Sequence, residues 1–390
     1  MSDVAIVGAC QTQHGMLHDR SLRSLISEAG NGAIADARID RKEIQAVYVG
    51  NYAANEFNGQ NAVAAFAATT VGLGDLPSVH VEGACASGGL AIREALIAIK
   101  AGIYHTALVI GVEKMNTKEG ADLMEVVGRG QDQDFEGPFN IPAVAGFALN
   151  AARHMHEFGT TKEHFAAVAE KNYYHGSLNP YAHKQRALPM ERILRGSARE
   201  LASPLGLHDI SLVTDGAASL VLTTLERARA LRPDPVIIKG SGLGGDSFTT
   251  AQKRSSVRFE ASVRAAKEAY AMAGLGPADI DVVECHDCFT ITEIINIEDL
   301  GFVEKGKGGP FTADGHTRLG GKLPVNTSGG LKSKGHPVGC TGVGQVVEMT
   351  WQLRGEADKR QVADAKVALT HVLGGPGAIS TVHVLERARD

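Results

Sequence analysis

The sequence has few cysteines, no long apolar run and no excess of positive charge, and each absence excludes a class of protein. Its five cysteines, an odd number in 390 residues, argue against a disulfide framework and favour a reducing compartment. No run of roughly 18 apolar residues occurs, so we expect no membrane span. The net charge of −5 argues against a nucleic acid partner. The first predicted strand begins at Val4 and leaves no room for a signal peptide, so a cytoplasmic protein is expected.

Strands and helices alternate along the first part of the chain. Apolar strands are predicted at Val4–Gly8, Ile44–Gly50 and Thr106–Gly111, and apolar residues at helical spacing predict helices at Leu22–Ile34 and Ala62–Ala68. This alternation is typical of an α/β sheet covered by helices. The chain also exceeds the roughly 250–300 residues at which a single core stops growing, so two or more packed units are expected.

The segment from residue 114 to 208 breaks this alternation. It is polar, rich in Gly, His and Pro, and contains helical pieces such as Lys162–Lys171. We expect it to be a large insertion that lies over the ends of the sheet. A further strand is predicted after it, at Gly216–Leu222.

The pattern starts again at about residue 235, which indicates a duplicated fold. Similarity over about 200 residues favours duplication rather than a solenoid, whose repeats span about 20–50 residues. We therefore divide the chain into an N-terminal half, 1–232, and a C-terminal half, 233–390, whose strand ends face one shared cleft. The corresponding elements of the second half are Val236–Gly240, Ser262–Ala273, Gly276–Glu284, Gly335–Leu353 and Ala365–Thr370.

Cys85 lies on a turn between a short strand that ends at Val79–Val81, predicted to be buried, and a helix that begins at or just after Ser87. Unpaired N–H groups and the helix dipole favour negative charge there, so a lowered thiol pKa and a reactive thiolate are expected. The small neighbours of Cys85 leave room for a substrate carbonyl. The alternative is an inert cysteine under the helix, because free cysteines are often fully buried.

Three loops of the second half, at 285–290, 334–340 and 371–377, carry His or Cys at corresponding strand ends, where α/β sheets usually bind ligands. His336 lies between a glycine and a proline, so its ring would be held in one orientation and could activate a thiol. The alternative for His336 is a buried structural imidazole. His371 is equally compatible with a structural role and with a place in the site.

A zinc site is a further alternative for the same loops. Cys285 and Cys288, together with His336 and Cys340, resemble a four-ligand spacing. However, the first pair follows an apolar strand rather than a glycine-rich knuckle, and the second pair comes about 50 residues later. Redox activity of Cys285 and Cys288 is not favoured, because no helix obviously begins at Cys285. The sequence therefore favours a site without metal.

Four motifs together resemble the thiolase superfamily over almost the whole chain. They are Cys85–Gly88, Asp215–Ala218, Asn326–Gly330 and Gly335–Gly342. The His-Asp-Cys-Phe loop, His286–Phe289, is similar to that of the sterol-carrier-protein-type branch, where most thiolases carry Asn-Glu-Ala-Phe. Most thiolases also have a second catalytic cysteine in a C-terminal Cys-x-Gly motif, where this chain has His371 and Leu373. In the similar branch the cysteine of the His-Asp-Cys-Phe loop takes over, which is Cys288 here.

The resemblance implies a fold and a reaction. The fold is a duplicated thiolase fold, with two βαβαβ-type halves in a layered α-β-α-β-α arrangement and an inserted loop domain at about 114–208. The reaction makes or cleaves 3-ketoacyl-CoA: Cys85 carries the acyl group, His336 takes the thiol proton, and Cys288 is the acid/base. His286 would hold a water in the site, and His371 is an additional candidate. The resemblance implies coenzyme A as substrate, with no metal and no permanently bound cofactor.

The partners implied are acyl-CoA, CoA and further copies of the chain in a homodimer or homotetramer. A small zinc-ribbon/OB-fold partner chain is compatible with the sequence, and neither nucleic acid nor membrane is expected. Two other functions stay open: a C-acyltransferase or retro-aldol lyase on a non-CoA or steroid-like acceptor, and a non-catalytic thiolase-fold subunit. The candidates for binding the CoA phosphates are Lys184, Arg186, Arg192, Arg195, Arg199, Lys253, Arg254 and Arg258.

Overall fold

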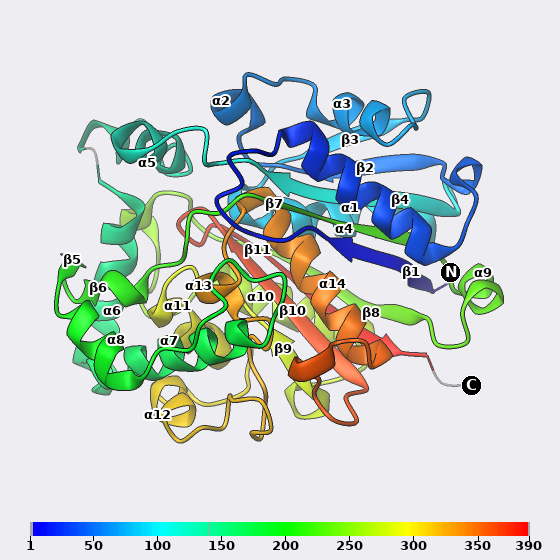
Figure 1. Cartoon of the computed structure of the whole chain (residues 1–390). Helices are drawn as coiled ribbons and strands as arrows, with labels where there is room; N and C mark the ends of the chain where they lie inside the picture. The colour runs from blue at the N-terminus through cyan, green and yellow to red at the C-terminus, as the bar shows by residue number, and fades with distance from the viewer. Residues whose placement is uncertain (1–2, 140, 389–390) are drawn as a thin grey trace.

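A large twisted sheet runs through the molecule in the computed structural model, which describes residues 3–139 and 141–388 (Figure 1). Nine strands of the described chain form this sheet. In spatial order they are β3 (Ser78–Val81), β2 (Ala46–Gly50), β4 (Thr106–Glu113), β7 (Gly216–Thr224), β1 (Val4–Gln11), β8 (Val236–Gly245), β11 (Ile379–Arg387), β10 (Val367–Gly374) and β9 (Val282–Glu284).

The sheet consists of two halves with the same strand order. In the first half, β2 pairs in parallel with β3 and β4, and β7 pairs antiparallel with β4 and β1. In the second half, β9 pairs in parallel with β10, and β11 pairs antiparallel with β10 and β8. A parallel bridge from Val283 to Val325 takes the place of β3, and the halves join where β1 meets β8. The predicted duplication is confirmed.

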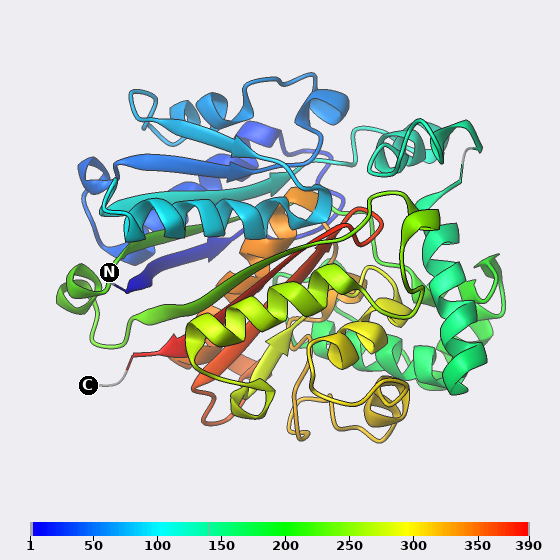
Figure 2. The same ribbon diagram turned by 180° about the vertical axis from the view of Figure 1, so that it is seen from behind.

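Helices cover both outer faces of the sheet and also fill the space between its halves (Figures 1 and 2). The outer face of the first half packs against α1 (Leu22–Ala37) and α3 (Val63–Thr70). The outer face of the second half packs against α10 (Glu260–Ala273) and α11 (Thr290–Asp299). In the centre, α4 (Ser87–Lys100) and α14 (Thr341–Arg354) pack on each other and on strands of both halves.

The side-chain alternation of β1 shows how one strand serves two layers. Val4 and Ile6 lie in the core around α4 and α14, whereas Ala5 and Val7 lie in the core under α1. Successive side chains of a strand point to opposite faces, so a strand covered on both faces is apolar throughout. The predicted α-β-α-β-α layering is therefore confirmed.

The segment from 114 to 208 forms mainly helices that gather at one end of the sheet (Figure 1). Within it lie α5 (Gly120–Gly128), α6 (Ala143–Phe158), α7 (Lys162–Ser177), α8 (Met190–Ser197) and the small hairpin of β5 (Glu200–Ala202) and β6 (Leu205–Gly206). Four further short helices are α2 (Ala54–Asn58), α9 (Leu225–Leu231), α12 (Gly308–Ala313) and α13 (Gly330–Ser333). The predicted division at residues 232–233 falls between α9 and β8, and it stays a prediction.

The predicted burial of the strand before Cys85 is wrong. β3 is the outermost strand of the first half, with β2 as its one neighbour in the sheet, and the Val79 side chain is 46% exposed. A second difference is α11, which the sequence did not indicate. All ten of its residues are buried, so it lacks the alternation of polar and apolar faces that identifies a surface helix. Within the described residues, no helix combines the length and apolar character needed to span a bilayer.

Candidate active site

Cys85 lies on a single 3₁₀ turn, Ala84–Ala86, between the end of β3 and the start of α4. The Ser87 side chain holds this turn closed: its Oγ accepts from the Gly83 N–H at 3.0 Å and donates to the Ala84 carbonyl at 2.6 Å. The local sequence therefore supplies a rigid turn that holds the sulfur at the end of a central helix.

The His336 ring faces the sulfur of Cys85. Its Nε2 lies 3.2 Å from Cys85 Sγ, and its Nδ1 lies 2.7 Å from Thr341 Oγ1. The Thr341 hydroxyl donates its only proton to the Pro337 carbonyl at 3.0 Å, so it accepts from Nδ1. The Nδ1–H tautomer is therefore fixed, and the lone pair of Nε2 points at the thiol.

Burial keeps this Cys–His pair neutral. It raises the pKa of the Cys85 thiol to about 12, with a further contribution from the Glu113 carboxylate, against the N–H groups of Cys85 and Gly375, which lower it. Burial likewise lowers the pKa of His336 to about 3. The prediction of a lowered pKa for the Cys85 thiol is therefore wrong. Burial raises this pKa more than the N–H groups at the helix end lower it. Proton transfer to Nε2 would have to accompany attack by the sulfur.

Replacement of Thr341 by valine should lower kcat by about 10-fold to 100-fold while leaving the fold intact. Valine has the same shape but accepts no hydrogen bond, so nothing holds the His336 proton on Nδ1. The measurement is the steady-state rate of CoA-dependent thiolysis, with Thr341→Ser as the control that keeps the hydroxyl. Equal loss in both variants would show that the hydroxyl does not orient the ring.

Asp287 anchors the loop that carries His286 and Cys288 through its hydrogen bonds. This buried carboxylate accepts from the N–H groups of Leu331 at 2.7 Å and Lys332 at 3.2 Å, at the start of α13, and from Asn172 Nδ2 at 2.8 Å. On one side of the loop, the His286 ring stands edge-on to His336, with centroids 5.2 Å apart.

Cys288 lies at the end of the same loop with its thiol 3.8 Å from Thr292 Oγ1. Burial raises the pKa of this thiol, and the nearby Cys85 contributes to the rise. Cys288 is therefore a neutral thiol, and it would need a bound substrate to act as a base.

Cys85, His286, Cys288 and His336 all border one cavity of about 410 Å³. Its wall is mostly apolar and comes from both halves and from the insertion, through residues such as Met115, Met124, Phe147, Leu212, Phe289 and Val338. Of the eight basic residues considered for the CoA phosphates, Lys253 alone borders this cavity, and its Nζ pairs with Asp246 at 3.2 Å. The structure thus brings together four of the five predicted site residues.

His371 is the exception, because it lies behind the site rather than in its wall. Its Nδ1 accepts from the His286 N–H at 3.4 Å, so its Nε2 carries the proton and donates to Ser262 Oγ at 2.8 Å. Both ring nitrogens are thus engaged and the side chain is fully buried. This geometry favours a residue that positions His286.

The buried His371 ring should make folding stability depend on pH. Burial lowers its pKa to about 3, whereas an unfolded histidine titrates near 6.5. Below about pH 6.5 the unfolded chain therefore binds the extra proton, and stability falls by up to about 1.4 kcal/mol per pH unit for this ring. In His371→Asn the slope of unfolding free energy against pH, from urea titrations between about pH 5 and 6, should be smaller by that amount. Parallel slopes would contradict a neutral buried ring.

The alternative of a four-ligand zinc site is not supported. Cys340 Sγ lies 3.9 Å from His14 Nε2, Cys285 Sγ contacts the Asn326 amide at 3.8 Å, and Cys288 points to Thr292. The four proposed ligands therefore do not meet at one point. Within the described residues, the one group of His, Cys or acidic side chains placed to hold a metal is Cys85, His286 and His336.

Two buried polar residues support the site without having been assigned a role from the sequence. Glu113 ends β4 and accepts from the N–H groups of Tyr52 at 2.8 Å and Gly339 at 2.9 Å, joining the two halves; burial raises its pKa to about 7. Asn326 accepts from the Cys285 N–H at 2.9 Å. Two signals could have identified these residues from the sequence: Glu113 lies at a strand end, and Asn326 lies in one of the four motifs.

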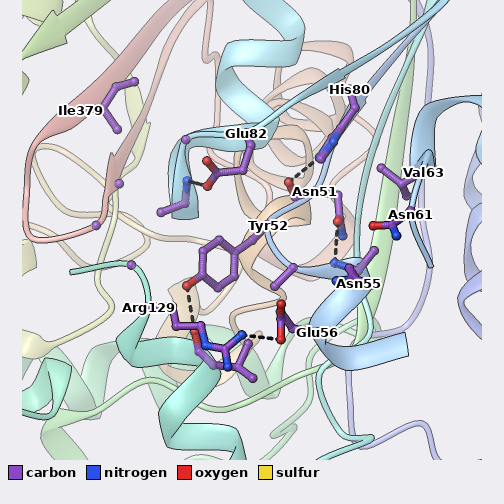
Figure 3. Close-up of a pocket in the computed structure, with 18 of the residues that line it drawn as sticks. Asn51, Tyr52, Asn55, Glu56, Asn61, Val63, His80, Glu82, Arg129 and Ile379 are labelled. Carbon is purple, nitrogen blue, oxygen red and sulfur yellow. Dashed lines mark hydrogen bonds and ion pairs between the residues drawn. The ribbon is translucent and has the colours of Figure 1, made fainter. Parts of the chain in front are cut away.

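A second cavity, of about 470 Å³, is lined in part by Gly83 and Ala84, next to Cys85. Figure 3 shows residues of its wall. Its lining is more polar than that of the first cavity and includes Asn51, His80, Glu82 and Arg129. Tyr52 borders both cavities and donates from its hydroxyl to the Val126 carbonyl at 2.9 Å. Neither Cys85 nor Cys288 borders this second cavity, so the first cavity is the candidate active site.

Comparisons with known proteins identify the family of this chain. A model of the thiolase N-terminal domain matches residues 4–198, and a thiolase C-terminal domain-like model matches 244–387. An acetyl-CoA acetyltransferase of Methanothermobacter thermautotrophicus is 43% identical, over 99% of this chain and 100% of the relative. Sterol carrier protein 2 of Bos taurus is 34% identical, over 96% of this chain and 71% of the relative.

Among solved structures, the Ltp2-ChsH2(DUF35) aldolase superposes with a TM-score of 0.85 and 26% identity, over 100% of this chain and 98% of that one. The relatives at 43% and 34% identity and the two domain models confirm the family that the sequence resembles. The chain belongs to the thiolase superfamily, in the branch of sterol carrier protein 2, and is an acyltransferase of the thiolase type.

Proposed function

We propose that this protein is a CoA-dependent thiolase that makes or cleaves 3-ketoacyl-CoA through an acyl group carried on Cys85. The observation that carries the proposal is the 3.2 Å contact between Cys85 Sγ and a His336 Nε2 whose lone pair is fixed by Thr341. Cys288 and His286 border the same cavity, which is the arrangement that a second, carbon–carbon bond-forming step needs.

The first half-reaction transfers the acyl group of a thioester to the enzyme. Cys85 Sγ attacks the thioester carbon while its proton passes to His336 Nε2, and that proton then leaves with the thiol of CoA. The N–H groups of Cys85 and Gly375 already point at the sulfur, so they are placed to donate to the oxyanion that forms next to it. Each such donor is worth about 3–4 kcal/mol in the transition state.

The second half-reaction joins the acyl group to a second thioester. The Cys288 thiol first gives its proton to His336 Nε2, and the resulting thiolate removes a proton from the α-carbon. The protonated His336, together with a water held by His286, donates to the enolate oxygen. The His286 Nδ1 is buried and without a partner among the described residues, so this ring has hydrogen-bonding capacity to spare. The enolate carbon then attacks the acyl group on Cys85, the bond from this group to Sγ breaks, and the released Cys85 thiolate takes the proton back from His336. Thiolysis is the same path in reverse.

Replacement of Cys288 by alanine should separate the two half-reactions. Acylation of Cys85 by acyl-CoA should persist and be visible as one added acyl group per chain in intact-mass spectra. Condensation, and thiolysis of 3-ketoacyl-CoA, should fall by at least about 10³-fold, because the α-proton then has no base. Loss of acylation together with condensation would place Cys288 in the first step and contradict this assignment.

A retro-aldol lyase is the second candidate, and its support is the Ltp2-ChsH2(DUF35) aldolase. It would cleave a carbon–carbon bond of a 3-hydroxyacyl thioester without forming an acyl-enzyme. A panel of 3-ketoacyl-CoA and 3-hydroxyacyl-CoA thioesters, assayed with and without free CoA, distinguishes the two. Turnover that needs free CoA supports the thiolase, whereas CoA-independent cleavage of the 3-hydroxy compounds supports the lyase.

Assembly and location complete the proposal. A homodimer or homotetramer is supported by the unpaired edge of β3 and by exposed apolar side chains such as Ile97 and Ile103, 47% and 65% exposed. A partner chain is supported by the aldolase relative, whose name joins Ltp2 to ChsH2(DUF35). The acetyl-CoA acetyltransferase relatives support CoA thioesters as substrates, and a cytoplasmic location stays part of the proposal.

A further inference from the structure

Three side chains that bind soft metal ions converge on one point of the active-site cavity. The candidate ligand atoms of Cys85, His286 and His336 all lie within 4.8 Å of one another. Tetrahedral zinc with sulfur at about 2.3 Å and nitrogen at about 2.0 Å holds its ligands about 3.5 Å apart. The Cys85–His336 contact of 3.2 Å is close to that separation, so small side-chain rotations would complete the site.

Both imidazoles are in the state that a metal needs. Thr341 holds the His336 proton on Nδ1, which leaves the lone pair of Nε2 directed at the Cys85 sulfur. The His286 Nδ1 is buried and has no hydrogen-bonding partner among the described residues.

The charge around the three ligands also favours a dication. Glu113 and Glu82 act on Cys85 as negative charges, and no lysine or arginine borders the cavity near the sulfur except Lys253, which is paired with Asp246. A cation with two positive charges would therefore enter a region of negative potential that has room for it. The cavity of about 410 Å³ gives access and leaves a fourth position for water.

We propose that the enzyme without bound substrate holds one zinc ion, or another thiophilic divalent cation, on Cys85 Sγ, His336 Nε2 and the His286 ring, and that this ion inhibits acyl transfer. The Cys85 thiol loses its proton to solvent as the sulfur–metal bond forms. The ion occupies the lone pair that would accept the thiol proton and the sulfur that would attack the thioester. It is an inhibitor that competes with substrate, and it takes no part in the reaction.

Cobalt is the direct probe of such a site. Chelator-treated protein titrated with Co²⁺ should develop the visible bands of tetrahedral cobalt and a thiolate-to-cobalt charge-transfer band, saturating at one ion per chain. Zn²⁺ should displace the cobalt, and calorimetry should give the same stoichiometry. Octahedral cobalt spectra, or no saturable binding, would overturn the proposal without any need for a variant.

Variants then identify the ligands. Cys85→Ser should abolish the charge-transfer band, and Cys85→Ser and His286→Asn should each weaken zinc binding by at least about 10-fold to 100-fold. Cys340→Ser is the matched control, because Cys340 also contacts a histidine, His14, but lies outside the cluster. Unchanged binding in Cys85→Ser, or lost binding in Cys340→Ser, would overturn the assignment.

The inhibition rests on the proposed function, but the binding does not. Where thiolysis is measured, Zn²⁺ should raise the apparent KM for the first thioester and leave kcat unchanged, and chelator should restore the rate. A chain that binds cobalt through Cys85 but cleaves no 3-ketoacyl-CoA would overturn the proposed function alone. A chain that is active and binds no metal at Cys85 would overturn this inference alone.

Discussion

Replacement of Cys85 by serine should reduce kcat/KM for thiolysis of 3-ketoacyl-CoA by about 10⁴-fold or more. The serine hydroxyl fits the same turn and can still donate to His336 Nε2, so packing and the Ala84–Ala86 turn should be preserved. An alkoxide is much harder to form than a thiolate, however, and a neutral imidazole with a pKa near 3 is too weak a base to form it. The loss should therefore lie in kcat, with thioester binding little changed.

The reaction to follow is the CoA-dependent loss of a 3-ketoacyl-CoA, together with intact-mass detection of the acyl-enzyme. Cys340→Ser serves as the control, because it removes another thiol that faces a histidine but does not border the cavity. Residual activity within 10-fold of the wild type in Cys85→Ser would contradict an acyl-Cys85 intermediate. Rapid alkylation by iodoacetamide is not expected, because the resting thiol is neutral.

The approach of Cys85 and His336 could be predicted from the duplication. Each residue comes with a 3₁₀ turn that opens one of the two central helices, Ala84–Ala86 before α4 and Val338–Cys340 before α14. Because the halves are related and these helices pack on each other, equivalent turns must meet at the same end of the molecule. The positions of most strands and helices could be predicted from the spacing of apolar residues along the chain.

The state of the Cys85 thiol and the place of His371 could not be predicted in the same way. A helix end favours a thiolate, but the pKa depends on how much water other segments exclude, and Glu113 on β4 adds its own charge. His371 lies on β10, where successive side chains face opposite sides of the sheet. An error of one residue in the predicted strand position would therefore move the His371 side chain from the face of the cleft to the face of α10. Its side chain points to Ser262 of α10.

The contact between the two central helices depends on glycine. A Cβ placed on Gly88 of α4 would lie 2.8 Å from the Gly339 carbonyl oxygen and 2.9 Å from the Val343 nitrogen, both backbone atoms. A Cβ on Gly342 would lie 2.4 Å from the Gly89 nitrogen. No rotamer change relieves a clash with backbone, so the helices approach this closely only without these side chains. The distance from Cys85 to His336 is set by this approach.

Replacement of Gly88 by alanine should therefore damage both stability and catalysis. Overpacking of a rigid core contact costs about 1–3 kcal/mol or more of unfolding free energy. A displacement of about 1 Å between the sulfur and Nε2 should also lower kcat by about 10²-fold. Urea unfolding and steady-state thiolysis are the two measurements, and both should change.

Gly344→Ala is the matched control for this substitution, because it places the same methyl group on the partner helix α14. There the nearest atom, Gln11 Oε1, is 3.6 Å away, which is ordinary contact. Alanine in a helix interior should then be neutral or stabilise by about 0.5–1 kcal/mol, with activity unchanged. If Gly88→Ala behaved like Gly344→Ala, the close approach of α4 and α14 would not control the Cys85–His336 distance. Because these two residues come from opposite halves of the sheet, the glycine contact between the halves is as necessary to the site as the reacting groups themselves.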